Sequence, residues 1–493
     1  MEGKELLLFQ LGPVQEFIAQ AAAVGDLWAG SYLLSSLILA GEKKVPGWDD
    51  AERINKNFVF PNFTETTVID AMEGKDRIPT IPNRFLAWVN AGKGEAVAED
   101  VKKAIREALD ELVAQFVPYA GAEDQARQFL SMTWAILPSS ELKNDMGDNY
   151  KAIGRRLALR RNLREFDAWY ENPNLKGNCK DFLSGKESAL LDGPGGSERD
   201  SRYRRGAMNL LKLELAKKHG RQSLKKDSKE KYIAVLAMDG DRMGAVLSGL
   251  QQEKDHQDFS SHLAKFSVSV KDMLPEGCSL VYAGGDDVLA VVPAVRALEI
   301  AEELAERFAG AMKGITWKDE NGQTREITAS VGIAVGSVKM PLQDLVHEAH
   351  AAEHCAKTDY GRGAFAMSVI KRSGEILHWG GKWGGAGVEL YHVLSHEFAD
   401  MTKDVTQGFA HKLAGFLSLY GLDKGLSIGE GDIGKIIAAE VEHVCGRSEI
   451  SSNVAMAAQN YVKEVFAGDC KRPQDFMAAF LCEDFIDRPR ESN

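Results

Sequence analysis

VYAGGDDVLAVV, residues 281–292, contains two apolar runs that flank a Gly-Gly-Asp-Asp turn. The runs predict two buried strands, and Gly284 and Gly285 can take the positive φ angles that a tight hairpin turn needs. Asp286 and Asp287 would then lie at a hairpin tip, where a carboxylate pair suits Mg²⁺ or Mn²⁺ bound together with substrate phosphates. For these four residues alone, an ordinary acidic turn is an equal alternative.

A second acidic turn follows an apolar run of strand length, Tyr232–Met238. The run predicts a buried strand that ends at Asp239, and Gly240 allows a phosphate to approach the backbone. Asp239 and the two hairpin carboxylates are therefore the predicted catalytic residues and metal ligands of a two-metal site for phosphoryl transfer. Asp241 either belongs to this site or caps the following helix.

The residues after the hairpin add a strand and a helix. The segment 326–335 predicts a buried strand, and an amphipathic pattern from about Pro341 to Lys357 predicts a helix. The order strand, helix, hairpin, helix, strand, helix is that of a ferredoxin-like palm, in which the first strand and the hairpin are central neighbours. Lys357 either compensates the helix dipole or, together with Arg362, binds a triphosphate. Ser330 is a candidate purine contact.

These motifs resemble the cyclase-type palm that diguanylate cyclases share with the large subunit of type III CRISPR effector complexes. Three N-terminal segments choose between the two families: LGPVQEFI at 11–18, DLWAGSYLLS at 26–35 and IPNRF at 81–85. They are similar to the first palm of the type III-B, or Cmr-type, large subunit. In that family the first palm lacks the acidic hairpin and supplies a second nucleotide pocket.

The resemblance implies an antiviral, RNA-guided complex whose partners are other type III-B subunits, a guide CRISPR RNA and a target RNA. Target RNA would switch on synthesis of a signal nucleotide from ATP. The product would be a cyclic oligoadenylate or a conjugate of ATP with S-adenosylmethionine, and the sequence does not choose between them. The expected nucleotide-binding residues are Gly240, Asp241, Gly284, Gly285, Ser330, Lys357 and Arg362.

The expected fold class is α+β, with two ferredoxin-like palms. The first palm is expected at 1–138, a helical connector at 139–228, the second palm at 229–372 and a C-terminal helical domain at 373–493. In the connector, Arg156, Arg160 and Arg164 lie on one helical face, which is either a solvated surface or an RNA contact. The glycine-rich segment 379–387 predicts a loop whose tryptophans pack on a core or stack on a base.

Composition limits the class of protein. With 493 residues, 44% of them hydrophobic and 27% charged, the chain has the composition of a globular protein with several domains. Its formal net charge of −12 argues against a protein that coats nucleic acid by itself. Six cysteines without paired spacing predict free thiols in a reducing cytoplasm. The start lacks a signal peptide pattern, and the apolar run at 32–40 is too short for a membrane span.

Two further expectations concern activities. The chain contains no His-Asp dipeptide, so we expect no nuclease domain of the HD type that many relatives carry. A scaffold subunit with a degenerate palm, which would organise guide RNA and partner subunits, is one alternative to the enzyme. A free-standing diguanylate cyclase is the other, and the N-terminal motifs weigh against it.

Overall fold

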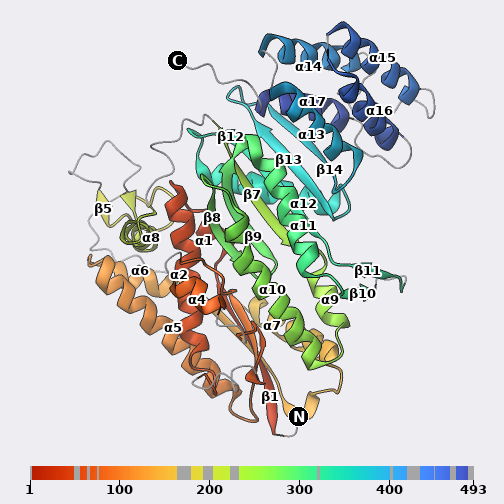
Figure 1. Cartoon of the computed structure of the whole chain (residues 1–493). Coiled ribbons are helices and arrows are strands. Elements are labelled where there is room, and N and C mark those ends of the chain that lie inside the picture. The colour runs from red at the N-terminus through yellow and green to blue at the C-terminus, as the bar shows by residue number, and fades with distance from the viewer. Residues whose placement is uncertain are drawn as a thin grey trace.

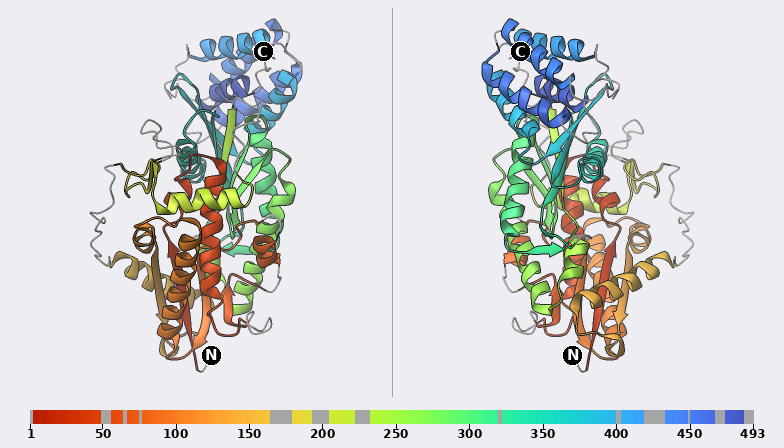
Figure 2. Two further views of the ribbon diagram at one scale, coloured as in Figure 1. Left: turned by 90° about the vertical axis from the view of Figure 1, so that its left-hand side faces the viewer. Right: turned by 90° about the vertical axis from the view of Figure 1, so that its right-hand side faces the viewer.

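Two sheets, one after the other along the chain, organise the protein (Figure 1). The computed structural model describes residues 3–48, 56–63, 67–74, 77–163, 179–192, 204–221, 232–318, 322–399, 403–418, 433–448, 450–466 and 474–486. Two further views show the C-terminal helices at one end of an elongated molecule and the N-terminal sheet at the other (Figure 2). The larger sheet lies between these two ends.

The N-terminal sheet forms around β1 (Lys4–Gly12), in which Leu6, Leu7, Leu8 and Phe9 are buried. A strand that is apolar on both faces needs cover on both sides, and its two faces lie in separate cores, Leu7 and Phe9 in one and Leu6 and Leu8 in the other. Along its edges β1 pairs with β3 and β4. The sheet order β2-β3-β1-β4 is that of a ferredoxin-like fold. The other elements of this region are α1 (Gln15–Ala19), α2 (Val24–Glu42), β2 (Phe58–Phe60), α4 (Thr67–Glu73), β3 (Arg84–Asn90), α5 (Gly94–Phe116), α6 (Ala122–Phe129) and β4 (Ser131–Leu137).

The second sheet has six strands in the order β14-β13-β12-β7-β9-β8. The part β12-β7-β9-β8 repeats the order of the first sheet, which confirms the predicted pair of ferredoxin-like palms. Its elements are β7 (Tyr232–Gly240), α9 (Met243–Gly249), α10 (Glu253–Met273), β8 (Ser279–Gly284), β9 (Asp287–Pro293), α11 (Ala297–Ala311), β12 (Ala329–Ser337), α12 (Leu342–Thr358), β13 (Ala364–Ile370) and β14 (Ile376–Lys382). A small hairpin, β10 (Thr316–Lys318) with β11 (Thr324–Glu326), precedes β12. The predicted strand at 326–335 therefore begins three residues late, at Ala329.

The glycine-rich loop predicted at 379–387 is wrong in its first half, because β14 runs through Lys382 and pairs with β13. Trp379 is 1% exposed and stacks on Tyr391, with ring centroids 5.5 Å apart. Its indole nitrogen also donates to the hydroxyl of Tyr461 at 3.2 Å. These contacts bind the edge of the sheet to the C-terminal helices, so this tryptophan packs in the core.

The C-terminal region is helical, as predicted. Its helices are α13 (Ala386–Ala399), α14 (Lys403–Ser418), α15 (Ile433–Arg447), α16 (Ser452–Phe466) and α17 (Gln474–Ile486). They share one hydrophobic core with α10 and α11 on one face of the larger sheet. The boundaries of the four predicted domains remain predictions, since packing joins the regions continuously.

The two palms pack against each other in a reciprocal way. Helix α2 of the first palm contacts β8 of the second, and α10 of the second contacts β2 of the first. Hydrogen bonds fix both junctions: Asn62 N donates to Ser260 Oγ at 2.8 Å, and Ala283 N donates to the Pro79 carbonyl at 3.1 Å. Helix α2 is long and apolar enough to cross a membrane, but 83% of its apolar window is buried, as in a core helix.

The connector begins with a 3-10 turn (Ser139–Glu141) and α7 (Met146–Asn162), followed by β5 (Leu191–Asp192), β6 (Arg204–Arg205) and α8 (Ala207–Lys218). The basic stripe of α7 binds the backbone of β4. Arg156 donates to the Ile136 carbonyl at 2.8 Å, and Arg160 donates to the Trp134 carbonyl at 3.0 Å with its guanidinium 3.9 Å from the Trp134 ring centre. These two arginines therefore hold α7 on the sheet, while Arg164 lies outside the described residues.

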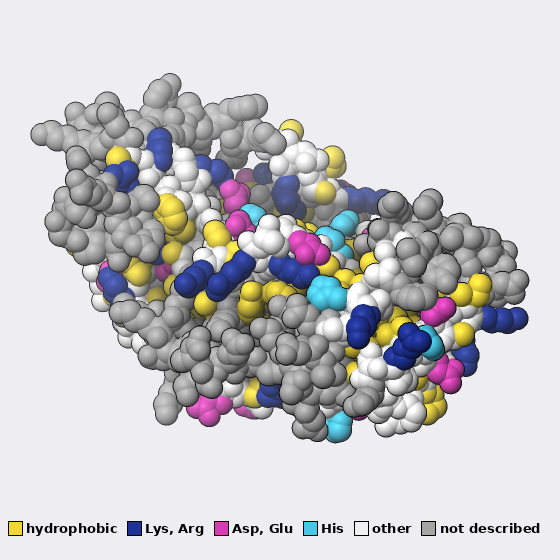
Figure 3. Space-filling view, turned by 90° about the horizontal axis from the view of Figure 1, so that it is seen from above, with side chains coloured by type: hydrophobic (Ala, Val, Ile, Leu, Met, Phe, Trp, Pro, Cys, Tyr) yellow, Lys and Arg dark blue, Asp and Glu magenta, His cyan; other side chains and the backbone are white. Residues whose placement is uncertain are grey.

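The surface combines both signs of charge. Seen from above, Lys and Arg side chains gather in a band across the middle of the molecule (Figure 3). None of the five cysteines in the described part of the chain forms a disulfide, as predicted.

Candidate active site

The acidic turn is fixed by hydrogen bonds from neighbouring elements. Gly285, with a φ of 66°, and Asp286 form the two-residue turn between β8 and β9. Ser267 Oγ of α10 donates to the Gly285 carbonyl at 3.2 Å, and Gly240 N donates to the Asp286 carbonyl at 3.1 Å. The tip of the hairpin is therefore bonded both to α10 and to the end of β7.

Two of the predicted glycines stand where a side chain does not fit. A Cβ at Gly240 would lie 2.8 Å from the Cβ of Asp286, so only glycine allows β7 to approach the hairpin this closely. A Cβ at Gly284 would lie 2.3 Å from the hydroxyl of Tyr282, which itself donates to the Gly284 carbonyl at 3.0 Å. Both glycines thus shape the site through the backbone.

Asp239, Asp286 and Asp287 meet at this tip, each with a carboxylate oxygen within 4.8 Å of the others. Burial, together with the Asp239 charge, raises the pKa of Asp286 to about 6. Burial, a hydrogen bond with Asp239 and the Asp286 charge also raise the pKa of Asp287 well above its usual value. Three carboxylates this close repel one another, and a divalent cation would remove the repulsion. Three hard oxygen donors fit Mg²⁺ or Mn²⁺, and these residues would hold the ion.

Lys357 reaches the same carboxylates from the last turn of α12. Its ammonium pairs with Asp239 and with Glu353. Burial opposes its charge, but hydrogen bonds to the two carboxylates outweigh burial and raise the pKa of Lys357. The structure therefore places a cation where a phosphate approaching Asp239 would meet it.

Asp241 lies apart from the three clustered carboxylates. It is 4% exposed and accepts hydrogen bonds from Thr328 Oγ1 at 2.7 Å, Ser330 Oγ at 2.8 Å and Gly363 N at 2.8 Å. Helix α9 begins after Arg242 without a side-chain cap, so Asp241 does not cap it. Asp241 instead ties β7 to β12 and to the turn after α12. Ser330 is fully buried with its hydroxyl in this network, which leaves it out of reach of a purine.

Arg362 occupies that same turn after α12, in a left-handed conformation with a φ of 67°. Its carbonyl accepts a hydrogen bond from the Lys382 ammonium, which also donates to the Gly361 carbonyl at 3.0 Å. The turn is therefore fixed by Asp241 on one side and Lys382 on the other. Arg362 directly precedes Gly363, whose backbone nitrogen donates to Asp241.

A cavity of about 320 Å³, the interdomain cavity, lies between the two palms and reaches Asp286. Its walls come from the first sheet, from α7, and from α9 and α10. The apolar lining includes Leu8, Leu86, Leu247, Phe259 and Leu263, and the polar lining includes Gln10, Arg84, Tyr150, Lys151, Arg161, Ser248, His256 and Ser260. Burial lowers the pKa of His256, so the ring is neutral. A largely apolar cavity with cations at its wall suits a planar base carrying phosphates.

Sequence reasoning missed the cations of this cavity. The pattern of α7 singles out Arg156 and Arg160, whereas Lys151 and Arg161 of the same helix line the cavity. Arg84 belongs to the IPNRF motif but gave no sign of its role. These residues could be identified only from the position of α7 on the first sheet, and that position is known only from the tertiary structure.

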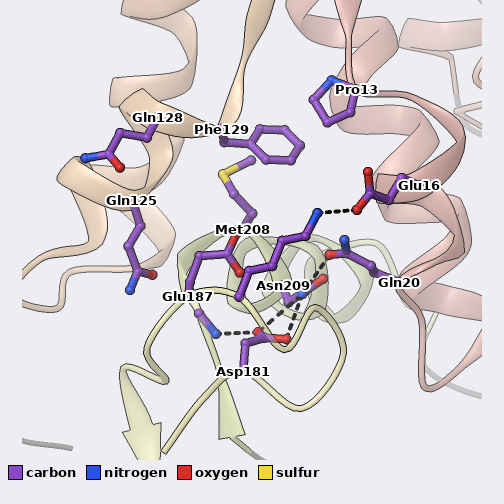
Figure 4. Close-up of a pocket in the computed structure, with 12 residues that line it drawn as sticks. Pro13, Glu16, Gln20, Gln125, Gln128, Phe129, Asp181, Glu187, Met208 and Asn209 are labelled. Carbon is purple, nitrogen blue, oxygen red and sulfur yellow. Dashed lines mark hydrogen bonds and ion pairs between the residues drawn. The ribbon is translucent and has the colours of Figure 1, made fainter. Parts of the chain in front are cut away.

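A second cavity, of about 200 Å³, lies between α1, α6 and the connector (Figure 4). Asp181 accepts hydrogen bonds there from Gly206 N and from the side chain of Asn209, and Lys186 pairs with Glu16. None of the predicted site residues lines it. This cavity anchors the connector to α1 and lies apart from the clustered carboxylates.

Comparison with known families matches two segments of the chain. Residues 232–366 match the family described as Cas10/Cmr2, second palm domain, and residues 6–114 match the family described as CRISPR-associated protein Cmr2, N-terminal. The first segment contains all three clustered carboxylates. The second contains Arg84 and helix α2, which packs on β8 of the second palm.

Known proteins are similar in sequence over part of the chain and in fold over nearly all of it. The CRISPR system Cmr subunit Cmr2 of Pyrococcus furiosus is 32% identical over 172 residues, which span 29% of this chain and only 19% of that protein. A type III-B Cmr-beta complex in its apo state contains a chain with a TM-score of 0.60 at 11% identity, covering 99% of this chain and 82% of that one. A Csm1–Csm4 cassette in complex with AMPPNP gives a TM-score of 0.50 at 15% identity, covering 97% and 70%. At these identities the structural likeness concerns the fold.

Proposed function

Because this chain belongs to the Cas10/Cmr2 family, we propose that it is the nucleotide-synthesising large subunit of a type III CRISPR effector complex. The proposed reaction is a metal-dependent nucleotidyl transfer that uses ATP. The observation that carries the proposal is the group of three carboxylates, Asp239, Asp286 and Asp287, of which Asp286 lines the interdomain cavity.

The carboxylates and the cavity together account for the parts that such a reaction needs. Mg²⁺ or Mn²⁺, when bound, would activate the attacking hydroxyl and neutralise the leaving pyrophosphate. Asp239, Asp286 and Asp287 would hold it. Lys357, which already pairs with Asp239, would exchange that partner for a phosphate. Arg362 would extend the phosphate contacts from the neighbouring turn.

The interdomain cavity would receive the base. Leu247, Phe259 and Leu263 offer apolar contacts, and Ser248 and neutral His256 offer hydrogen-bonding groups at the wall formed by α9 and α10. Adenine is the proposed base by likeness to the family. The Csm1–Csm4 relative binds AMPPNP, an ATP analogue.

Arg84 gives the first palm a part in the reaction. It lies on the wall of the cavity that also contains Asp286, and its charge acts on that carboxylate. A guanidinium in this position would bind the phosphates of a second nucleotide, whose hydroxyl attacks the first. The product is a cyclic oligoadenylate or an ATP conjugate of S-adenosylmethionine.

The proposed setting is the cytoplasm, in a complex with other type III-B subunits, guide CRISPR RNA and target RNA. The test is to assemble that complex and incubate it with target RNA and ATP, with and without S-adenosylmethionine, and to identify products by mass spectrometry. We expect a product that requires Mg²⁺ or Mn²⁺ and disappears in the D286A/D287A double variant.

Three results of this experiment would contradict the proposal. Absence of any product from the intact complex would leave the chain as a scaffold subunit. Synthesis of cyclic diguanylate from GTP by the isolated chain would make it a diguanylate cyclase. A D286A/D287A variant that no longer assembles would show that the hairpin is structural.

A further inference from the structure

Helix α12 carries an ion pair that differs from the other pairs of its spacing. Glu353 and Lys357 lie one turn apart on this helix, and their side chains are only 15% and 18% exposed. In the other pairs four residues apart among the described residues, the carboxylate side chain is 45–61% exposed. An exposed pair contributes little to stability, whereas a pair with little exposure must offset the cost of desolvating two charges. Helix stability alone therefore does not explain the pair on α12.

Gly332 fixes the position of this pair. Helix α12 packs on β12 and β7, and a Cβ at Gly332 would lie 2.0 Å from the Ala349 carbonyl oxygen and 2.2 Å from the backbone nitrogen of Glu353. Only glycine therefore lets the helix lie this close to β12. Ser330, two residues before Gly332, lies opposite Asp239 in the ladder between β12 and β7. The pair on α12 is thus held against the end of β7 that carries Asp239.

Lys357 is shared between two carboxylates of different surroundings. Its ammonium contacts an oxygen of Asp239 and an oxygen of Glu353. Asp239 also has a carboxylate oxygen within 4.8 Å of those of Asp286 and Asp287, and Glu353 is not a member of that group. The lysine therefore connects a carboxylate of the candidate metal site with a carboxylate outside it.

A lysine and a divalent cation compete at Asp239. A carboxylate that binds Mg²⁺ or Mn²⁺ has the ion at about 2 Å, and the ion repels an ammonium on the same carboxylate. Burial raises the pKa of Asp286 and of Asp287, and the charge of Lys357 partly opposes both shifts. The ammonium thus supplies part of the positive charge that the three carboxylates need, and a metal ion would have to replace it.

Glu353 gives Lys357 a partner that lies outside the metal site. When Asp239 binds a metal ion, Lys357 can keep its contact with Glu353 without any movement of α12. This contact avoids leaving a largely buried ammonium unpaired. Without Glu353, Asp239 would be the only carboxylate paired with Lys357 among the described residues. The lysine would then depend entirely on a metal ligand.

We propose that Lys357 competes with the metal ion for Asp239, and that Glu353 is a positioning residue that holds Lys357 when the metal ion is bound. The inference rests on the metal binding that the proposed function assigns to Asp239, Asp286 and Asp287. Paired with Asp239, Lys357 restrains metal binding; paired with Glu353, it remains beside the site for a phosphate. A phosphate that draws Lys357 away from Asp239 would free that carboxylate, so metal and triphosphate would favour each other's binding.

The first test measures Mn²⁺ binding to the full-length chain without nucleotide, by isothermal titration calorimetry. K357Q should raise the affinity about fivefold, because the competing ammonium is removed. E353Q should lower the affinity at least about threefold, because Lys357 then pairs with Asp239 alone. The control E348Q changes another glutamate of α12, which forms no ion pair in the described part of the chain. It should bind Mn²⁺ as the wild type does.

The opposite signs separate this proposal from a folding defect. Damage to the fold would weaken Mn²⁺ binding in both variants, so a loss in K357Q as well as in E353Q would overturn the proposal. The double variant E353Q/K357Q shows whether Glu353 acts through the lysine, and its affinity should match that of K357Q. If E353Q causes the same loss with and without Lys357, Glu353 attracts the metal by its own charge, and its positioning role is wrong.

The double variant D286A/D287A identifies the site that is titrated and should lose this Mn²⁺ binding. If it binds as the wild type does, the metal-binding part of the proposed function is wrong, and this proposal with it. If it loses binding while K357Q and E353Q bind as the wild type does, the proposed function stands and the competition at Asp239 does not occur.

The second test titrates Mn²⁺ into the assembled complex with target RNA and ATP. E353Q should need at least about three times more Mn²⁺ for half-maximal synthesis, with the maximal rate unchanged. K357Q should need less Mn²⁺ but have a lower maximal rate, because it lacks a phosphate contact. A lower maximal rate in E353Q without a change in its Mn²⁺ requirement would overturn the positioning role.

Discussion

The two palms share one topology and differ at the positions that carry chemistry. In the second palm, Asp239 of β7 follows directly after the Met238–Val288 pair, so Asp239 lies opposite Asp287. In the first palm, Gln10 of β1 lies opposite Arg84, the first residue of β3. The same point of the same fold thus carries two acids in one palm and an amide and a guanidinium in the other.

This difference suits the two palms to different ligands. Two acids suit a divalent cation, whereas a guanidinium and an amide suit phosphate oxygens and hydroxyl groups. Gln10 and Arg84 both line the interdomain cavity, and so does Asp286, the neighbour of Asp287 in the hairpin. The fold supplies matching positions in the two palms, and under the proposed function their side chains would divide metal binding and phosphate binding between them.

The largest expected effect comes from removing one acid at the matched position. D287N should lower nucleotide synthesis by at least about a thousandfold, because a metal ligand is lost. The matched change Q10A in the first palm should lower it only a few-fold. Initial rates at saturating ATP check both variants, and an equal loss in the two would show that the palms are chemically alike.

The next effect concerns the first palm's cation. R84Q should raise the KM for ATP and lower kcat/KM by about 10- to 100-fold, because one guanidinium contact to phosphate is removed. R106Q on α5, an exposed arginine, serves as control and should have no effect. An unchanged kcat/KM for R84Q would remove the first palm from the reaction.

A smaller effect concerns stability without metal. The pKa of Asp286 is raised from 3.8 to about 6 in the folded chain, so the folded state binds the proton more tightly than the unfolded state does. Stability should therefore increase as the pH falls from above 6 toward 4. D286N should reduce this dependence, with the raised pKa of Asp287 leaving the remainder, and it should be more stable than the wild type by about 1–2 kcal/mol at pH 8.

The measurement is thermal or urea unfolding in EDTA across this pH range, with D258N, a change of an exposed acid, as the control of equal charge. Adding Mg²⁺ should stabilise the wild type more than D286N. A wild type whose stability does not change between pH 4 and 8 relative to D286N would mean that the carboxylates do not repel one another.

The smallest expected effect tests the basic stripe of α7. R160Q removes a hydrogen bond and a cation–π contact to Trp134, and should lower the free energy of unfolding by about 1 kcal/mol. R155Q, on the exposed side of the helix, should change it by less than about 0.5 kcal/mol. Binding of oligouridine should be the same in both. A loss of RNA binding in R160Q but not in R155Q would show that the basic stripe of α7 contacts RNA.

Both palms and the acidic hairpin could be predicted from sequence because their signals are local. Buried strands appear as short apolar runs, and the double glycine before Asp286 marks a turn. The same rules failed at β14, whose glycines predicted a loop. Gly380 lies there against Tyr360, where a Cβ would approach the ring to 2.5 Å, so close packing rather than turn geometry requires glycine.

The partners of the site residues could not be predicted, because they come from segments far apart in sequence. Ser330 looked available to a purine beside the hairpin, but its hydroxyl donates to Asp241, 89 residues earlier. The cavity cations of α7 depend on how the connector crosses the first sheet. Tertiary contacts of this kind leave no periodic signal in the chain.

The reciprocal packing of α2 on β8 and of α10 on β2 has a consequence for dissecting the protein. A fragment that contains only the second palm would expose the face of its sheet that α2 covers, including buried Val281, Leu289 and Val291. Such a fragment would associate through this face or aggregate. We therefore do not expect the second palm to fold as an independent unit, and point substitutions in the whole chain test its residues better than truncation does.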